Sequence, residues 1–168
     1  MEIKSLTSIK GRENQFLTLL TDCVESGASV GFLKPIDKAE LIAYWLGVES
    51  DLESNRRKLF AVYDGGKLVA CVQLSLCAKA NGRHRGEVEK LMVATSSRGQ
   101  GISKRLMAFM EQAAVELNLS LLILDTRLGD VASSLYRAMG YTEAGQIPQF
   151  ARSSNGQLEG TVFFYKLL

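Results

Sequence analysis

The segment "EVEKLMVATSSRGQGISKRLM", Glu87–Met107, joins an apolar stretch to a helical pattern through a loop that is rich in glycine and serine. Alternating side chains at its start predict a strand, whereas its end has the residue spacing of a helix. Lys104 and Arg105 lie where that helix begins, although the N-terminus of a helix already carries about half a positive charge. A strand, a glycine loop and a helix in this order predict a site for an anion at Arg98–Ser103.

Two properties of the loop favour an anion. Backbone N–H groups at the start of a helix have no partner within the helix, and Gly99 and Gly101 let anionic oxygens approach such groups closely. Arg98 adds a planar guanidinium group that suits phosphate, and the first helical turn adds two more cations. A tight turn with solvated cations would have the same composition, so the loop alone leaves both interpretations open.

Residue spacing excludes two common phosphate-binding loops. The nucleotide-binding motif GxxxxGK[ST] does not follow either Gly99 or Gly101. The dinucleotide-binding motif GxGxxG, started at Gly99, would need glycine at the position of Lys104. The loop therefore belongs to neither of these two classes of nucleotide site.

The composition describes one ordinary globular domain that spans residues 1–168. Of the 168 residues, 46% are hydrophobic and 23% are charged, which is sufficient for a single core. The formal net charge of +2 is too small to favour nucleic acid or an anionic membrane surface as a partner. The pattern contains no transmembrane segment and no internal repeat. We expect a monomer or a homodimer.

The cysteines and the N-terminal residues predict a cytoplasmic location. Three cysteines, an odd number, lie within apolar segments, and the first residues lack the charged-then-apolar pattern of a secretion signal. We expect the cysteines to pack in the core. His84 is the only histidine and no CxxC spacing occurs, so no metal site is predicted. His84 lies between Arg83 and Arg85 in a polar turn, where a surface position is expected.

The rest of the chain alternates between helix and strand patterns, which predicts an α/β fold with a mixed sheet. Apolar residues at helical spacing predict helices over 11–27, from 38 onward, over 101–118 and over 130–141. Strand patterns occur at 1–7, 58–64, 67–78, 87–94, 119–126, 141–147 and 160–168. Gly65 and Gly66 predict a hairpin, because glycine accepts positive φ. The expected buried stripe of the second helix is Leu41, Ile42, Trp45 and Leu46.

The loop matches the motif [QR]-x-x-G-x-[GA] of the GNAT acetyltransferases, with Ser103 in place of the last small residue. Residues 86–107 resemble the central strand, pyrophosphate loop and helix of that family, and "LYRAMGY", 135–141, resembles its later helix. The segments "GASVGF", "QLSLCAKANG" and "EVEKLMV" are similar to the tabtoxin-resistance members of the family. Many relatives carry an asparagine where this chain has Gly129.

The resemblance implies the GNAT fold, a twisted, mixed, mostly antiparallel sheet that is splayed at a cofactor cleft and flanked by helices. It implies acetyl-CoA as the cofactor, CoA as a product, and direct attack of a small-molecule amine on the thioester. The pantetheine arm is expected to pair with backbone groups of Leu91, Met92 and Val93. The pyrophosphate is expected at Arg98, Gly99, Gln100, Gly101, Ile102 and Ser103.

Two glutamates are the candidates for the base that removes a proton from the amine. Glu87 comes first, because its strand position matches the acidic position that is common in the family, and Glu89 comes second. Strand alternation predicts that both project from one face together with Leu91 and Val93. A solvated charge, or an ion pair with a neighbouring cation such as Lys90, is the structural alternative for either glutamate.

Tyr136 is the candidate for the acid that protonates the departing CoA thiolate, because the family commonly carries a tyrosine at this place in "LYRAMGY". A phenol with an ordinary pKa of about 10 remains protonated at pH 7. The structural alternative is a ring that fills the core together with Leu135 and Met139.

The sequence leaves the acceptor and two further function classes open. The candidate acceptors are toxins or antibiotics of the tabtoxinine-β-lactam type, other amino acids, polyamines and aminoglycosides, as for a bacterial antibiotic-resistance enzyme. A regulatory domain that binds CoA without turnover would retain the loop, whereas an interaction module would need neither loop nor base. We expect the acceptor pocket between the first two helices, the "GASVGFLKP" loop and the last hairpin.

Overall fold

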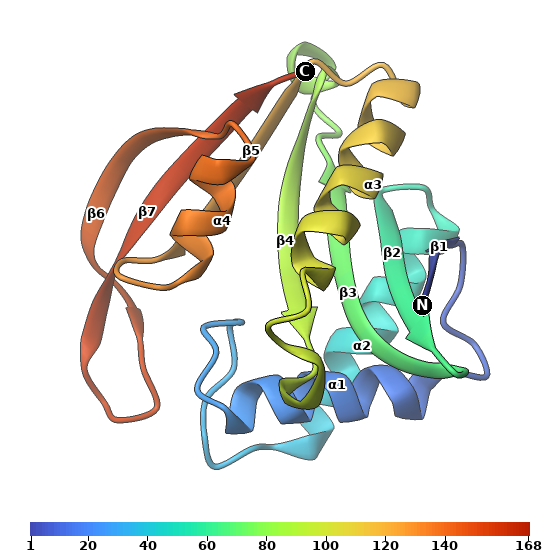
Figure 1. Cartoon of the computed structure of the whole chain (residues 1–168), viewed down its shortest axis with the longest axis vertical. Coiled ribbons are helices and arrows are strands. Elements are labelled where there is room, and N and C mark those ends of the chain that lie inside the picture. The colour runs from blue at the N-terminus through green and yellow to red at the C-terminus, as the bar shows by residue number, and fades with distance from the viewer.

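One sheet forms the centre of the molecule, and the computed structural model describes all 168 residues around it (Figure 1). Its strands lie in the order β1-β2-β3-β4-β5-β7-β6. They are β1 (Glu2–Leu6), β2 (Arg57–Asp64), β3 (Lys67–Leu76), β4 (Arg85–Val93), β5 (Leu121–Arg127), β6 (Thr142–Arg152) and β7 (Leu158–Leu167). Every neighbouring pair is antiparallel except β4 and β5, which run parallel. The predicted mixed, mostly antiparallel sheet is confirmed.

The helices are α1 (Glu13–Glu25), α2 (Lys38–Glu53), α3 (Ile102–Glu116) and α4 (Ala132–Ala138). The Asp37 side chain caps α2 by accepting a hydrogen bond of 2.9 Å from the backbone N–H of Ala39. Gly101, which has a φ of 71°, directly precedes α3 as its N-cap residue. None of the four combines the length and the apolar character that crossing a membrane requires.

Two apolar cores hold the helices against opposite faces of the sheet. The core under α3 and α4 contains 19 buried residues and the core under α1 and α2 contains 17, so the central strands are buried on both faces. The rings of Phe16 of α1 and Trp45 of α2 pack at a tilted angle within the second core, with centroids 4.9 Å apart. The helix pairs are therefore fixed separately, one on each side of the sheet.

The predicted buried stripe of α2 is partly wrong. Ile42 and Leu46 are 43% and 66% exposed. The buried apolar residues of α2 are Leu41, Trp45, Val48 and Leu52. Their spacing of three and four residues follows one helical face, whereas the residue after each of the first two lies about 100° further around the axis.

A β-bulge interrupts β4. Gln73 of β3 pairs with Glu89, but Cys71, two residues earlier, pairs with Met92, three residues later. One extra residue of β4 is therefore accommodated between these pairs, next to Lys90, whose φ is 51°.

The bulge changes which side chains share a face of β4. Met92 packs in the α1/α2 core, as expected for the face of Glu87 and Glu89, whereas Leu91 and Val93 pack against the α3/α4 core. The prediction that the two glutamates share a face with Leu91 and Val93 is therefore wrong. Strict alternation cannot reveal an inserted residue, because the insertion reverses every later position.

The sheet splits between β4 and β5. Their parallel pairing covers only Arg85 with Leu121 and the two pairs that follow, ending at Glu87 with Ile123. Beyond this point β4 pairs with β3 alone and β5 pairs with β7 alone, and the two strands diverge (Figure 1).

Candidate active site

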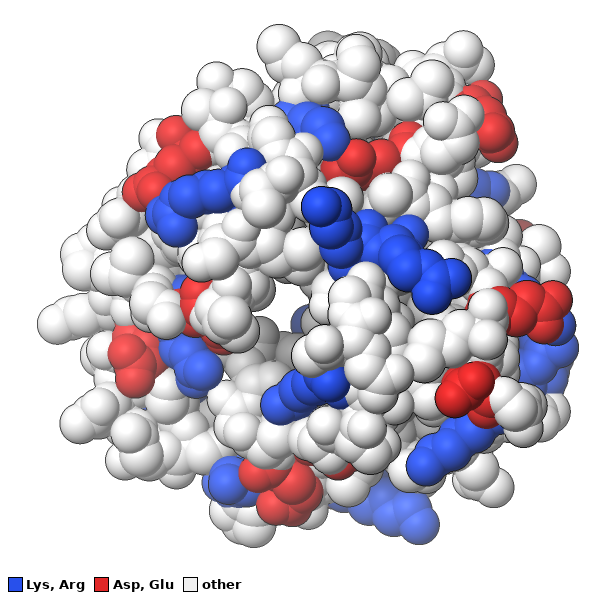
Figure 2. Space-filling view, viewed as in Figure 1, with Lys and Arg blue, Asp and Glu red and all other residues white.

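The divergence of β4 and β5 opens a cleft of about 890 Å³. Its walls come from β4, β5, the start of α3, α4, the segment after α1 and the β6–β7 hairpin. Figure 2 shows it as an opening in the middle of the molecule with Lys and Arg side chains near its rim. One continuous cleft thus connects the predicted anion loop to the predicted base.

The loop Arg98–Ser103, the predicted anion loop, presents free backbone N–H donors at one part of this cleft. Gly99 and Gly101 have φ of 76° and 71°, and a Cβ added to either would meet nothing within 4 Å. No backbone N–H from Gly99 to Lys104 donates to a backbone oxygen, and the first helical bond is from Arg105 to the Gly101 carbonyl, 3.3 Å. Consecutive free amides of this kind form a concave site for an anion such as pyrophosphate.

Arg98 is anchored rather than free in solvent. Its Nε donates to the Val93 carbonyl at 3.2 Å and its Nη2 donates to Ser26 Oγ at 2.9 Å. Asp22 of α1 also accepts hydrogen bonds from the Thr95 backbone N–H and hydroxyl, at 2.7 and 2.8 Å. These contacts fix the loop to β4 and to the end of α1. The guanidinium therefore holds the loop in place in addition to supplying positive charge near the predicted anion site.

The cleft brings together nearly all of the predicted cofactor residues. Those on its walls are Leu91, Met92, Val93, Arg98, Gly99, Gly101, Ile102 and Ser103. Gln100 is exposed and does not line the cleft. Lys104, in the first turn of α3, lines the cleft as well.

Carboxylates gather where β4 and β5 separate. Glu87 lines the cleft, is exposed to it, and makes no hydrogen bond or ion pair. Its partial burial, followed by the nearby charges of Glu89 and Asp125, raises its pKa above the ordinary value. Asp125 also lines the cleft and accepts a hydrogen bond of 2.8 Å from the Thr161 hydroxyl. Because Glu87 pairs with Ile123, Asp125 lies two residues further along the same face of the sheet.

Sequence reasoning missed Asp125. The signal was present, because a carboxylate that ends the apolar run "LLIL" reaches the edge where this strand separates from its neighbour. The pairing partner of that strand was not predicted, so the distance to Glu87 was not visible from the sequence.

Glu89 belongs to a network of charged side chains. Its Oε2 accepts a hydrogen bond of 2.6 Å from Arg57 Nη1, and the same guanidinium contacts Gln73 Oε1 at 2.7 Å and Asp51 Oδ2 at 3.2 Å. The ion pair considered as an alternative is therefore present, but its partner is Arg57 of β2 rather than Lys90. Of the two predicted glutamates, Glu87 is therefore the one whose carboxylate has neither a hydrogen-bond nor an ion-pair partner.

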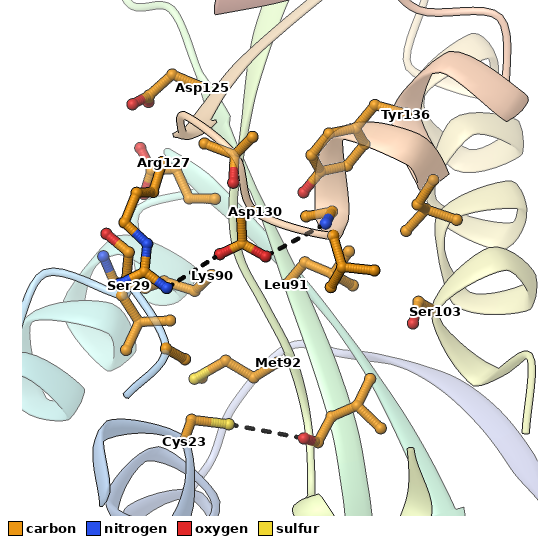
Figure 3. Close-up of a pocket in the computed structure, with 18 of the residues that line it drawn as sticks. Cys23, Ser29, Lys90, Leu91, Met92, Ser103, Asp125, Arg127, Asp130 and Tyr136 are labelled. Atoms are coloured by element: carbon orange, nitrogen blue, oxygen red, sulfur yellow. Dashed lines mark hydrogen bonds and ion pairs between the residues drawn. The ribbon is translucent and has the colours of Figure 1, made fainter. Parts of the chain in front are cut away.

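Tyr136 fits both interpretations that the sequence left open, because its ring packs in the core while its hydroxyl is available as an acid. Its side chain is 6% exposed, and its ring lies 5.7 Å from the Tyr141 ring and 5.8 Å from the Phe164 ring, measured between centroids. Its hydroxyl points into the cleft (Figure 3) and makes no hydrogen bond within the chain. Burial, with the charges of Asp130 and Asp125, raises the pKa of the phenol, so it stays protonated at neutral pH.

Gly129 has a φ of 83° and is followed by a carboxylate with a structural task. Asp130 accepts a hydrogen bond of 3.3 Å from the Ala132 backbone N–H at the start of α4, and pairs with Arg127 Nη2 at 3.6 Å (Figure 3). Arg127 also donates to the Gly27 carbonyl at 3.3 Å, which links β5 to the segment after α1 across the cleft. No three His, Cys, Asp or Glu side chains gather in a way that could hold a metal ion.

Solved structures of other proteins share this fold. A ribosomal-protein-alanine N-acetyltransferase from Brucella melitensis aligns over 100% of both chains, with a TM-score of 0.83 and 23% identity. A Salmonella typhimurium protein, assigned as an acetyltransferase and solved with its cofactor acetyl-CoA, aligns over 100% of this chain and 95% of its own. Its TM-score is 0.79 at 14% identity. A protein assigned as a phosphinothricin N-acetyltransferase aligns over 99% of both chains, with a TM-score of 0.83 and 15% identity.

At these identities the structural similarity demonstrates the fold, and the sequence match adds the family. The model of the acetyltransferase (GNAT) family matches residues 18–141, which include β4, the anion loop and α4. The glycine loop with free amides and the splayed strands fit the acetyl-CoA that the Salmonella protein contains. The chain therefore belongs to the GNAT family of acetyltransferases.

Proposed function

We propose that this protein is an N-acetyltransferase that transfers the acetyl group of acetyl-CoA to a primary amine of a small molecule. The observation that carries this proposal is the continuity of one cleft. It has the free amides of Gly99–Lys104 at one part and the unpaired carboxylate of Glu87 at another. A domain that only bound CoA would need the first feature but not the second.

The residues of the loop and of β4 would hold the cofactor. The free amides and Lys104 would bind its pyrophosphate, because they present donors and positive charge to open space. Leu91–Val93 do not pair with β5, and those of their backbone groups that are still free would pair with the pantetheine arm. The Val93 carbonyl already accepts a hydrogen bond from Arg98. When bound, acetyl-CoA supplies the activated acetyl group.

Glu87 would act as the base. A lysine-like amine with a pKa of about 10.4 is neutral in roughly one molecule in 2,500 at pH 7, so removal of its proton limits attack. The raised pKa of Glu87 brings this carboxylate closer to the value at which a base works efficiently near neutrality. Glu89, held by Arg57, would contribute by its charge, which helps to raise the pKa of Glu87.

We expect the change Tyr136→Phe to lower turnover about 100-fold, because the variant loses the proton donor for the sulfur of CoA while it keeps the buried ring. Single-turnover measurement of acetyl transfer tests this, with acetyl-CoA affinity and melting temperature expected to stay at the parental values. Tyr141→Phe is the matched control, because the Tyr141 hydroxyl is buried and outside the cleft. A Tyr136→Phe variant with parental single-turnover rates would contradict the role.

The proposed function as a whole is tested by release of the CoA thiol from acetyl-CoA in the presence of a panel of amines. The panel contains a β-lactam amino acid of the tabtoxinine type, common amino acids, polyamines and an aminoglycoside. Thiol release that depends on one amine, with a product heavier by one acetyl group, is the expected result. Calorimetric binding of acetyl-CoA without release for any amine would instead support the regulatory alternative.

An amino-acid-like toxin is our first choice of acceptor. The segment "GASVGF" that resembles the tabtoxin-resistance enzymes supplies Gly27–Gly31 to the cleft wall. On the same resemblance we propose a bacterial resistance enzyme. The composition and the cysteines favour a single domain in the cytoplasm, as a monomer or a homodimer.

A further inference from the structure

We propose that Lys90 binds a carboxylate of the acceptor, so that the acceptor is an amino acid or another amine that carries a carboxylate. This inference rests on the proposed function and specifies its substrate class. It arises from the position of one cation in the cleft and from the contacts that this cation makes.

The ammonium group of Lys90 is a half-buried charge without an anionic partner. Its Nζ lies 5.9 Å from the centroid of the Phe32 ring and 5.5 Å from that of Tyr44. No carboxylate oxygen lies within 4.0 Å of it, and it makes no hydrogen bond. Burial lowers its pKa from the ordinary value. The two aromatic faces and the more distant charges of Glu89, Asp125 and Glu87 compensate only part of the hydration that this ammonium loses, so an anionic ligand would find a prepared partner.

The backbone directs Lys90 to this position. The β-bulge lets Lys90 and Glu89 both project toward the α1/α2 side, although neighbours in a regular strand point to opposite faces. Without the extra residue, the Lys90 side chain would point into the opposite apolar core. Non-glycine residues at positive φ are strained, and such strain is typical of residues that a functional site holds in place.

The other charged groups of the cleft leave Lys90 as the available cation on its wall. Arg127 is paired with Asp130, and Arg98 is anchored to Ser26 and Val93. Figure 3 shows Lys90 on the wall opposite Tyr136. Lys104 lies in the first turn of α3, beside the free amides that would bind the cofactor.

The carboxylates of Glu87 and Asp125 and the ammonium of Lys90 together suit an acceptor that carries both a positive amine and a negative carboxylate. Glu87 and Asp125 would attract the amine of the acceptor at the junction of β4 and β5, and Lys90 would attract its carboxylate. Gly31 preserves the space required, because a Cβ at that position would lie 3.2 Å from the Lys90 Nζ. A diamine or an aminoglycoside would instead bring a second positive charge toward Lys90.

The test compares acids with their amides in the parent protein and in two variants, Lys90→Met and Lys90→Arg. The probes are glycine, β-alanine and γ-aminobutyrate with their amides, and L-lysine with cadaverine. We expect the parent to show a KM about tenfold or more lower for the best acid than for its amide, the scale of one charge-assisted contact. Lys90→Met should remove this preference, so that an acid and its amide have similar KM values, and Lys90→Arg should retain part of it.

A binding measurement keeps the inference separate from the proposed function. With CoA present, γ-aminobutyrate and its amide are compared by the melting temperatures of the parent and of Lys90→Met. If γ-aminobutyrate raises the melting temperature of the parent more than its amide does, and Lys90→Met lacks this difference, carboxylate binding is supported even if no amine is acetylated. The same preference in Lys90→Met, or no preference for any acid in the parent, would overturn it. Parental affinity of both variants for acetyl-CoA, measured by calorimetry, verifies that they are folded.

Discussion

Replacing Gly101 with valine is expected to abolish binding of acetyl-CoA. The residue has a φ of 71°, which a β-branched side chain adopts only with strain, and its Cβ would occupy the open space before the free amides. Turning the backbone to relieve the strain would also turn these amides away from the cleft. Acetyl-CoA should raise the melting temperature of the parent protein, as a ligand selective for the native state must, and should leave that of Gly101→Val unchanged.

A matched control separates loss of binding from general damage. Gly11 has a φ of 77° and equally open surroundings, but it does not line the cleft, so Gly11→Val carries the same strain and should keep the shift. Arg98→Ala should reduce affinity about tenfold or more, because it removes one cation and two anchoring hydrogen bonds. A full acetyl-CoA shift in Gly101→Val would contradict the assignment of the loop.

The change Glu87→Gln is expected to lower turnover about 100-fold at pH 7, because glutamine cannot accept the proton of the amine. The parental rate should fall as the pH drops through the raised pKa of Glu87, since the protonated carboxyl is no longer a base. The rate of the Glu87→Gln variant should not show this fall. Its turnover should return toward the parental value at high pH, where the amine loses its proton without a base. Profiles of rate against pH for both proteins test this expectation.

Stability should move in the opposite direction from activity in this variant. A carboxyl whose pKa is raised in the folded state contributes stability below its unfolded pKa and loses that contribution as the pH rises through the folded value. At pH 7 the charged Glu87 therefore costs stability that glutamine does not. The melting temperature of Glu87→Gln should equal or exceed that of the parent, and a clear decrease would indicate a structural role instead.

Glu89→Gln is the comparison for Glu87→Gln, because it changes a neighbouring carboxylate on the same face of β4. It should reduce turnover less, but it should reduce stability, since Arg57 loses its 2.6 Å partner while it remains largely buried. Parental pH profiles in both variants would place base catalysis elsewhere.

The local features of this fold could be predicted from the sequence. The hairpin at Gly65–Gly66, the cap at Asp37 and the glycine loop before α3 each depend on residues that are adjacent in the chain. For such features the conformational preference of a few side chains is sufficient. The family match and the α/β architecture followed from the same short segments.

Features that depend on distant segments could not be predicted. The bulge at Lys90 is fixed by pairing with β3, and the approach of Asp125 to Glu87 is fixed by the parallel pairing of β4 with β5. The partner of Glu89 is likewise an arginine 32 residues away in the chain. The sequence therefore indicated which residues take part in the candidate site, whereas the register of the sheet decided which of them are free to act.

The short pairing of β4 with β5 makes β4 an edge strand in the interior of the molecule. Edge strands normally expose a row of donors and acceptors that invites strand addition by another protein chain and leads to aggregation. Here α4, the start of α3 and the β6–β7 hairpin line the cleft along this edge, so the edge faces the cleft and not the outer surface of the molecule (Figure 1). The protein can thus keep its sheet open for a slender, extended ligand while this edge stays turned away from its outer surface.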